Sequence, residues 1–144
     1  MPNYTFATSH DATAIRDCML QHHNIPAQFI SGAESESWEP EFNDKTMYIS
    51  VKAGAVLHGF FVLLRKDVHI AEAHMIFYRS AWGQVAEMGR QCLRWIWTNF
   101  PFITMLAAPV KVGNRLAERC IRKMGFTDTK IVVAGYKRFY YSKL

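Results

Sequence analysis

The chain has 144 residues, 50% of them hydrophobic, and a net charge of +5. This size and composition predict a single domain, residues 1–144, that buries its own core without disulfides or metals. No apolar run reaches the roughly 18 residues of a membrane span, and the first residues lack the pattern of a signal peptide. We therefore expect a cytoplasmic protein whose three cysteines, Cys18, Cys92 and Cys120, are buried thiols without metal-ligand spacing.

The N-terminal third predicts a strand, a helix and a loop. Residues 4–8 form a short β-rich run, and Ser9 or Asp11 can cap a helix that runs to about His23. The apolar stripe of this helix consists of Ile15, Cys18 and Met19. Residues 24–27 and 31–44 read as a loop-rich region with acidic residues at Glu34, Glu36, Glu39 and Glu41. These acids favour a cationic amine as partner, but a solvated acidic loop is the commoner explanation.

Three strands are predicted in the middle of the chain. Residues 47–51 and 56–64 are apolar or alternating, and a turn around Gly54 joins them. The third strand, residues 68–77, carries Glu72 and His74 at positions of the same parity, so both side chains face one side. They are either a catalytic pair or polar positions on a half-exposed strand face.

The second half continues with a loop, a helix and a strand. Residues 78–84 predict a loop, and an apolar stripe then predicts a helix from Val85 to about Phe100. A short apolar strand over residues 103–109 is expected to end at Pro109, because proline cannot donate to a sheet ladder.

The segment Asn114–Phe126 is the most informative part of the chain. It predicts an amphipathic helix with apolar residues on one face and basic residues on the other. Gly125 can adopt the left-handed conformation that ends a helix. Two β-rich runs, residues 130–134 and 136–141, are expected to close the sheet.

From Val68 onward this order of elements, with Asn114, Ala117 and the pair Gly125-Phe126, resembles the GNAT N-acetyltransferase superfamily. The resemblance implies an α/β fold with a mixed, largely antiparallel central sheet, a V-shaped splay and helices on both faces. It also implies acetyl-CoA as cofactor and transfer of acetyl to a primary amine of a small molecule or protein. The N-terminal part of the chain fits more loosely.

The resemblance implies which residues contact acetyl-CoA. In the family, backbone N–H groups of the strand-to-helix loop bind the pyrophosphate, and small residues let the phosphates approach. The family pattern is Gln or Arg, two variable residues, Gly, one variable residue, and Gly or Ala. Aligning Gly83 with the central Gly puts Ser80 at the first position, whereas aligning Arg79 there puts Trp82 at the Gly. We expect a divergent but working phosphate loop, with a decayed site as the alternative. The expected cofactor contacts are Ile76, Tyr78, Arg79, Ser80, Ala81, Trp82, Gly83, Gln84, Val85 and Asn114.

Acetyl transfer in this family needs a base and an acid. Presenting a neutral alkylamine at pH 7 costs about 4 to 5 kcal/mol, so we expect Glu72 or His74 to remove the proton through water. The family often has a Tyr seven residues after the Asn as the acid, but Ile121 occupies that position. Without it, either no transfer occurs or the proton comes from water or from one of three side chains, Cys120, Tyr78 and Tyr136.

Two other functions stay open. The missing Tyr suits a non-catalytic GNAT-fold assembly or accessory protein of a bacteriophage, acting in the host cytoplasm by protein–protein contact. Trp38 and Phe42 are then interface candidates, and a homodimer or a viral assembly partner fits the same interpretation. The basic residues are spread along the chain, so a nucleic-acid-binding module is the weaker option.

Overall fold

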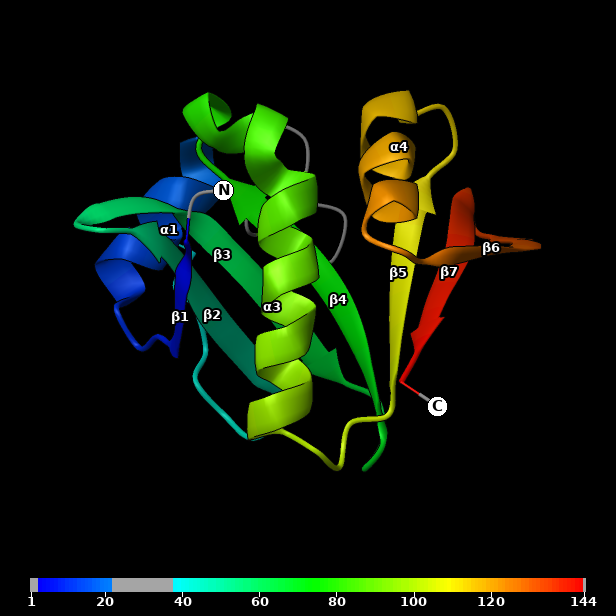
Figure 1. The fold of residues 1–144 in the computed structure, drawn as a ribbon, viewed down its shortest axis with the longest axis horizontal. Coiled ribbons are helices and arrows are strands. Elements are labelled where there is room, and N and C mark those ends of the chain that lie inside the picture. Colours follow the sequence, from blue (N-terminus) through cyan, green and yellow to red (C-terminus); the bar gives the residue numbers. More distant parts are fainter. Residues whose placement is uncertain (1–2, 22–37, 144) are drawn as a thin grey trace. The chain divides into compact units, whose positions relative to one another are not determined.

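The computed structural model describes residues 3–21 and 38–143. Their elements are β1 (Thr5–Thr8), α1 (Ala12–Gln21), β2 (Thr46–Ala53), β3 (Val56–Arg65), β4 (Ile70–Phe77), η1 (Arg79–Gln84), α3 (Val85–Asn99), β5 (Met105–Lys111), α4 (Arg115–Lys123), β6 (Thr127–Val133) and β7 (Tyr136–Ser142). The strands form one mixed sheet with the hydrogen-bonded order β1-β2-β3-β4-β5-β7-β6 (Figure 1). Strands β4 and β5 are parallel, whereas the pairs β1–β2, β5–β7 and β6–β7 are antiparallel. The predicted α/β class with a largely antiparallel sheet is confirmed. None of the described helices is long and apolar enough to cross a membrane.

The chain forms two compact units. The first unit comprises Met1–Leu63 and His74–Gly83, and the second comprises Leu64–Ala73 and Gln84–Leu144. The second half of β4 and η1 as far as Gly83 therefore belong to the first unit. The first half of β4 belongs to the second unit with α3, β5, α4, β6 and β7.

Helix α1 of the first unit begins as its sequence predicts. The carboxylate of Asp11 accepts a hydrogen bond from the Ala14 N–H at 3.1 Å, which satisfies one of the orphan amides of the first turn. Asp11 in turn donates its own N–H to the Ser9 hydroxyl at 3.3 Å. The predicted inward residues Ile15, Cys18 and Met19 are fully buried. The expected helix end near His23 and the acids Glu34 and Glu36 lie outside the described residues.

A glycine lets β3 approach the end of β4 within the first unit. Gly59 has a φ of +153°, and a Cβ built on it would collide with the carbonyl oxygen of Ile76 and lie 2.7 Å from the Cα of Phe77. Phe61 and Phe77 pack edge to face beside it, with ring centroids 5.1 Å apart. This position therefore requires glycine for both backbone conformation and space.

Strand β5 of the second unit differs from its predicted extent. It begins at Met105 and continues through Pro109 to Lys111, so the expected stop at Pro109 is wrong. Pro109 lies opposite Arg138 in the antiparallel register with β7. The parallel register with β4 pairs Ile70–Glu72 with Met105–Ala107, so it ends before Pro109 and the missing N–H costs no bond there.

Helices α3 and α4 of the second unit pack side by side (Figure 1). Gly89 on α3 makes room for α4, because a Cβ at this position would lie 2.6 Å from the sulfur of Met124. The Arg90 guanidinium donates to the carbonyl oxygen of Lys123 at 2.6 Å. Gly125 has a φ of +103° and ends α4, which confirms the predicted stop.

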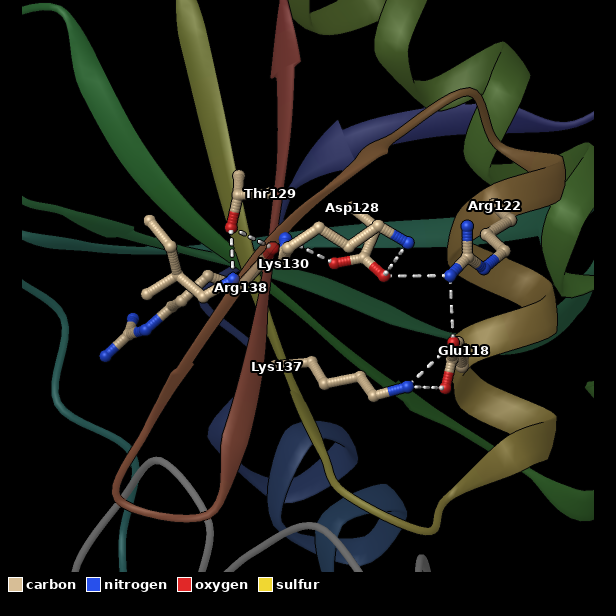
Figure 2. A network of polar contacts seen from close by, with 8 residues as sticks. Glu118, Arg122, Asp128, Thr129, Lys130, Lys137 and Arg138 are labelled. Carbon is tan, nitrogen blue, oxygen red and sulfur yellow. Dashed lines mark hydrogen bonds and ion pairs between the residues drawn. The ribbon is translucent and has the colours of Figure 1, made fainter.

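A polar network joins α4 to the last two strands of the second unit, as Figure 2 shows. Glu118 accepts from Lys137 at 3.0 Å and from Arg122 at 3.0 Å. Arg122 also donates to Asp128 at 2.9 Å, and Asp128 accepts from the Lys130 N–H at 2.8 Å. The network ties edge strand β6 to α4 beside the register shift between Asp128 and Val132.

This network makes stability depend on pH. Hydrogen bonds lower the pKa of Glu118, the larger contribution coming from Lys137 and the smaller from Arg122. The hydrogen bond from the Lys130 N–H lowers the pKa of Asp128. A depressed folded-state pKa contributes stability above the ordinary values of 4.5 and 3.8, and that stability is lost as pH falls through the lower folded values. We expect the melting temperature of the wild type to fall more steeply below about pH 4.5 than that of Glu118→Gln. Circular dichroism melts between about pH 3 and pH 7 test this, and parallel curves would contradict it.

Candidate functional site

The segment expected to be a phosphate loop is helical. Residues Arg79–Gln84 form the 3-10 helix η1, which leads directly into α3 at Val85, so the prediction of a loop is wrong. The segment does lie between strand β4 and helix α3, as predicted. The Trp82 indole N–H donates to the carbonyl oxygen of Phe77 at 3.2 Å, a contact that holds the segment wound back on the strand end. The spacing of small residues gives no sign of this contact.

The backbone N–H groups of Arg79 and Ser80 lie at the start of η1 in the first unit, and their two neighbours are already hydrogen-bonded. The Tyr78 N–H donates to the His58 carbonyl oxygen at 3.0 Å, and the Ala81 N–H donates to the Tyr78 carbonyl oxygen at 2.9 Å. The first N–H groups of a helical segment have no acceptor inside it. Those of Arg79 and Ser80 have no acceptor among the described residues. Both residues are exposed, so an anion can reach their N–H groups.

The surface around this helix start suits a close-approaching anion. Gly83 is exposed, and a Cβ built on it would meet none of the described atoms within 4 Å. The Arg79 guanidinium lies 5.4 Å from the ring centroid of Trp82, which holds a positive charge beside the free amides. Amides, the Ser80 hydroxyl and a guanidinium are donors that fit a pyrophosphate. Ala81 and Val85 are buried, so only their main chains are candidates for cofactor contact.

Tyr78 in the first unit is held by a carboxylate. Its hydroxyl donates to Asp17 at 2.7 Å, linking the end of β4 to α1. Burial, and then this hydrogen bond, raise the pKa of Tyr78 well above its ordinary value of 10.0. The phenol keeps its proton at neutral pH and donates it in a hydrogen bond to Asp17, which makes Tyr78 a weak candidate for protonating a thiolate. Because Asp17 and Tyr78 are 61 positions apart, their contact could not be predicted from residue spacing.

The last residues of β4 in the first unit are buried. The Ile76 carbonyl oxygen accepts a hydrogen bond from the Cys18 thiol at 3.5 Å. Burial, with a smaller contribution from Asp17, raises the pKa of Cys18 to about 12, so the thiol stays protonated. His74 is 9% exposed. A catalytic role for His74 and a main-chain contact from Ile76 stay predictions.

Glu72 in the second unit lies between two cations. Its carboxylate oxygen Oε2 is 3.6 Å from Lys66 Nζ and 3.9 Å from Arg138 Nη1, and 14% of the side chain is exposed. Opposite charges at this range attract the carboxylate and restrict its position. The sequence placed Glu72 on the strand, but neither cation could be assigned to it from spacing. Its role as base stays a prediction.

Asn114 and Ile121 have clear structural roles in α4. The Asn114 side-chain oxygen accepts from the Ala117 N–H at 3.1 Å and caps the helix, which leaves its amide nitrogen as the group for a cofactor contact. Ile121 is 3% exposed and belongs to the core of the second unit. Beside it, burial raises the pKa of the Cys120 thiol to about 11. The side chain at the position of the family's Tyr therefore offers no proton.

No protein-family model matches this sequence, and no curated protein matches it. Solved structures do match. A spermidine N-acetyltransferase from Vibrio cholerae, in complex with CoA and spermine, has a TM-score of 0.69 at 16% identity, covering 97% of this chain and 95% of that chain. The N-acetyltransferase PseH from Campylobacter jejuni, in complex with acetyl coenzyme A, has a TM-score of 0.63 at 13% identity, covering 71% of each chain. The chain thus has the fold of the GNAT N-acetyltransferases, which confirms the fold expected from the resemblance.

Proposed function

We propose that this protein is an acetyl-CoA-dependent N-acetyltransferase that acetylates a primary amine. The observation that carries the proposal is the strand-to-helix junction, where Arg79, Ser80 and Gly83 present free amides, a cation and open backbone. The fold supports it, because the matching structures include proteins solved with acetyl coenzyme A and with CoA and spermine. A small-molecule amine or a protein amine are both acceptors of the right chemistry.

Each part of the cofactor has a matching group in this chain. When bound, acetyl-CoA supplies the acetyl group as a thioester. The amides of Arg79 and Ser80, with the Arg79 guanidinium, would bind the pyrophosphate, and the main chains of Trp82–Val85 would lie alongside it. Asn114 would donate its amide nitrogen to the pantetheine arm while its oxygen caps α4. In the first unit, the resemblance implies that main-chain groups of Ile76 and Tyr78 also contact acetyl-CoA.

The acceptor amine must lose a proton before or as it attacks. Glu72, which lies beside Lys66 and Arg138, would take that proton through water, with His74 as the second candidate. The departing thiolate needs a proton in return. Since Ile121 cannot donate and Tyr78 donates to Asp17, we propose that water, Cys120 or Tyr136 supplies it.

Gly83→Ala tests the pyrophosphate contact without disturbing the fold. The new methyl group has open space in the described structure, so stability should stay level or rise by about 0.4–1 kcal/mol. It would stand between the backbone and a bound phosphate, and we expect acetyl-CoA affinity to fall about tenfold or more. Calorimetric titration and a melting curve on the same samples measure both. Unchanged acetyl-CoA affinity in the folded variant would contradict a pyrophosphate contact at Gly83.

The buried Ile121 also favours a second candidate, a non-catalytic protein of the same fold that acts through protein–protein contact. Such a protein would show no acetyl-CoA consumption with any amine. An amine panel therefore separates the two functions: turnover with one amine or more selects the transferase. Binding of acetyl-CoA without turnover selects a protein that has kept the cofactor and lost the chemistry.

A further inference from the structure

A cationic cluster surrounds Glu72 on one sheet face of the second unit. In the register, Glu72 pairs with Ala107 on β5, and Arg138 on β7 pairs with Pro109, two residues further along β5. Paired residues share a face, and residues two apart on a strand share it too, so Glu72 and Arg138 lie on the same side. Lys111, also on β5, has the same parity and is exposed.

Short side chains on β5 allow Arg138 to reach across that strand. Ala107 and Pro109 occupy the positions between β4 and β7, and Ala107 is 6% exposed. Arg138 Nη1 comes to 3.9 Å from Glu72 Oε2 over these small residues. Figure 2 shows the Arg138 side chain pointing away from Lys137 and Glu118, as strand alternation requires. The guanidinium and the carboxylate thus meet over these small residues.

Among the described residues, the contact with Glu72 engages one nitrogen of the Arg138 guanidinium. Arg138 keeps 30% of its side chain exposed, and its contact with Glu72 is long for a charged hydrogen bond. A guanidinium has five N–H donors in a planar fork that matches a carboxylate or a phosphate. The half-buried rings of Tyr136 and Tyr140 lie two residues to either side on β7, on the same face. An anionic group can therefore bind here with the carboxylate of Glu72 a few ångströms away.

We propose that Arg138 determines acceptor specificity by binding an anionic group of the acceptor while the acceptor's amine lies at Glu72. The proposal rests on the acetyltransferase function proposed above. The acceptor is then an amine that also carries a carboxylate or a phosphate, and not a polyamine. Among the described residues, Lys66 and Arg138 approach Glu72, and Lys111 lies on the same strand face, so these cations would repel a second ammonium on the acceptor. This differs from the cationic acceptor that the acidic loop in the sequence favours.

Three acceptors of equal length test the proposal. 4-Aminobutyrate, butylamine and putrescine differ in carrying an anionic, an uncharged or a cationic end. We expect kcat/KM of the wild type to be highest with 4-aminobutyrate and lowest with putrescine. Because Arg138 also lies beside Glu72, Arg138→Gln can alter the rate with every amine, but it should lower kcat/KM about 10- to 100-fold more with 4-aminobutyrate than with butylamine. Phosphoethanolamine against ethanolamine shows whether phosphate is preferred to carboxylate. A wild-type preference for putrescine, or an equal loss with all three amines, would overturn the proposal.

The control variants separate charge from recognition. Arg138→Lys keeps the charge without the fork and should restore part of the activity, whereas Lys143→Gln removes an exposed positive charge and should change nothing. Equilibrium binding of the product 4-acetamidobutyrate is measured alongside, because it does not need turnover. Binding about tenfold weaker in Arg138→Gln supports the proposal even if acetyl transfer is absent and the function fails. Equal binding in both proteins overturns it even if the enzyme is active.

Discussion

Replacing Glu72 with glutamine and His74 with alanine is expected to lower kcat about 10²- to 10⁴-fold. An alkylammonium must lose its proton to attack a thioester, and these are the two polar side chains that strand parity places on one face of β4. Single variants assign the role, because the base alone should account for most of the loss. Initial rates of acetyl-CoA consumption at saturating amine measure the effect.

Two controls make this result interpretable. Acetyl-CoA affinity, measured by calorimetry, should change little in the double variant and in each single variant, since neither Glu72 nor His74 is expected to contact the pyrophosphate. Glu118→Gln removes a carboxylate from the network with Lys137 and Arg122, so it should lower the melting temperature and leave kcat unchanged. A double variant that is folded, binds acetyl-CoA and keeps its full kcat would show that the base lies elsewhere.

Gly59→Ala is expected to cost about 3 to 5 kcal/mol of folding free energy. The added methyl group would overlap the Ile76 carbonyl oxygen and the backbone of Phe77, and φ of +153° is a conformation that alanine rarely adopts. Backbone atoms cannot swing aside as the end of a long side chain can. For a domain of ordinary stability, 5–15 kcal/mol, this is a large share.

Urea unfolding followed by tryptophan fluorescence measures the Gly59→Ala effect. Gly83→Ala is the matched control, because the same methyl group meets open space there and should be tolerated. If Gly59→Ala were too unstable to purify, Gly59→Ser would be as unstable, and thermal melts of crude soluble fractions would show the loss against Gly83→Ala. A cost below about 1 kcal/mol at Gly59 would mean that β3 and β4 are further apart than described.

Most elements of the fold follow from short stretches of sequence. Asp11 and Asn114 cap their helices with their own side chains, and Gly125 ends α4 at a positive φ. These interactions join residues two or three positions apart, so residue type and spacing are enough to predict them. The apolar stripes of α1 and α3 are local in the same way, since helical periodicity sets which side chains share a face.

Boundaries and pairings needed the tertiary structure. Strand β5 passes through Pro109 because of which neighbour it pairs with at that point, and η1 is helical with Trp82 bonded to Phe77. Neither the strand that pairs with Pro109 nor the hydrogen bond of Trp82 to Phe77 can be predicted from the local sequence alone. Element type was therefore easier to predict than element ends, as expected when packing decides the ends.

The sequence by itself determined the order of the elements, the Asp11 cap, the Gly125 stop and the fold that the solved structures confirm. It also selected Glu72 and His74 by parity and Gly83 by type. Only the tertiary structure decided which charges surround Glu72, that Tyr78 donates to Asp17, and that Ile121 lies in the core. Caps and periodicity are properties of neighbouring residues, whereas the Arg138–Glu72 and Tyr78–Asp17 contacts join residues more than sixty positions apart, which only strand register and helix packing bring together.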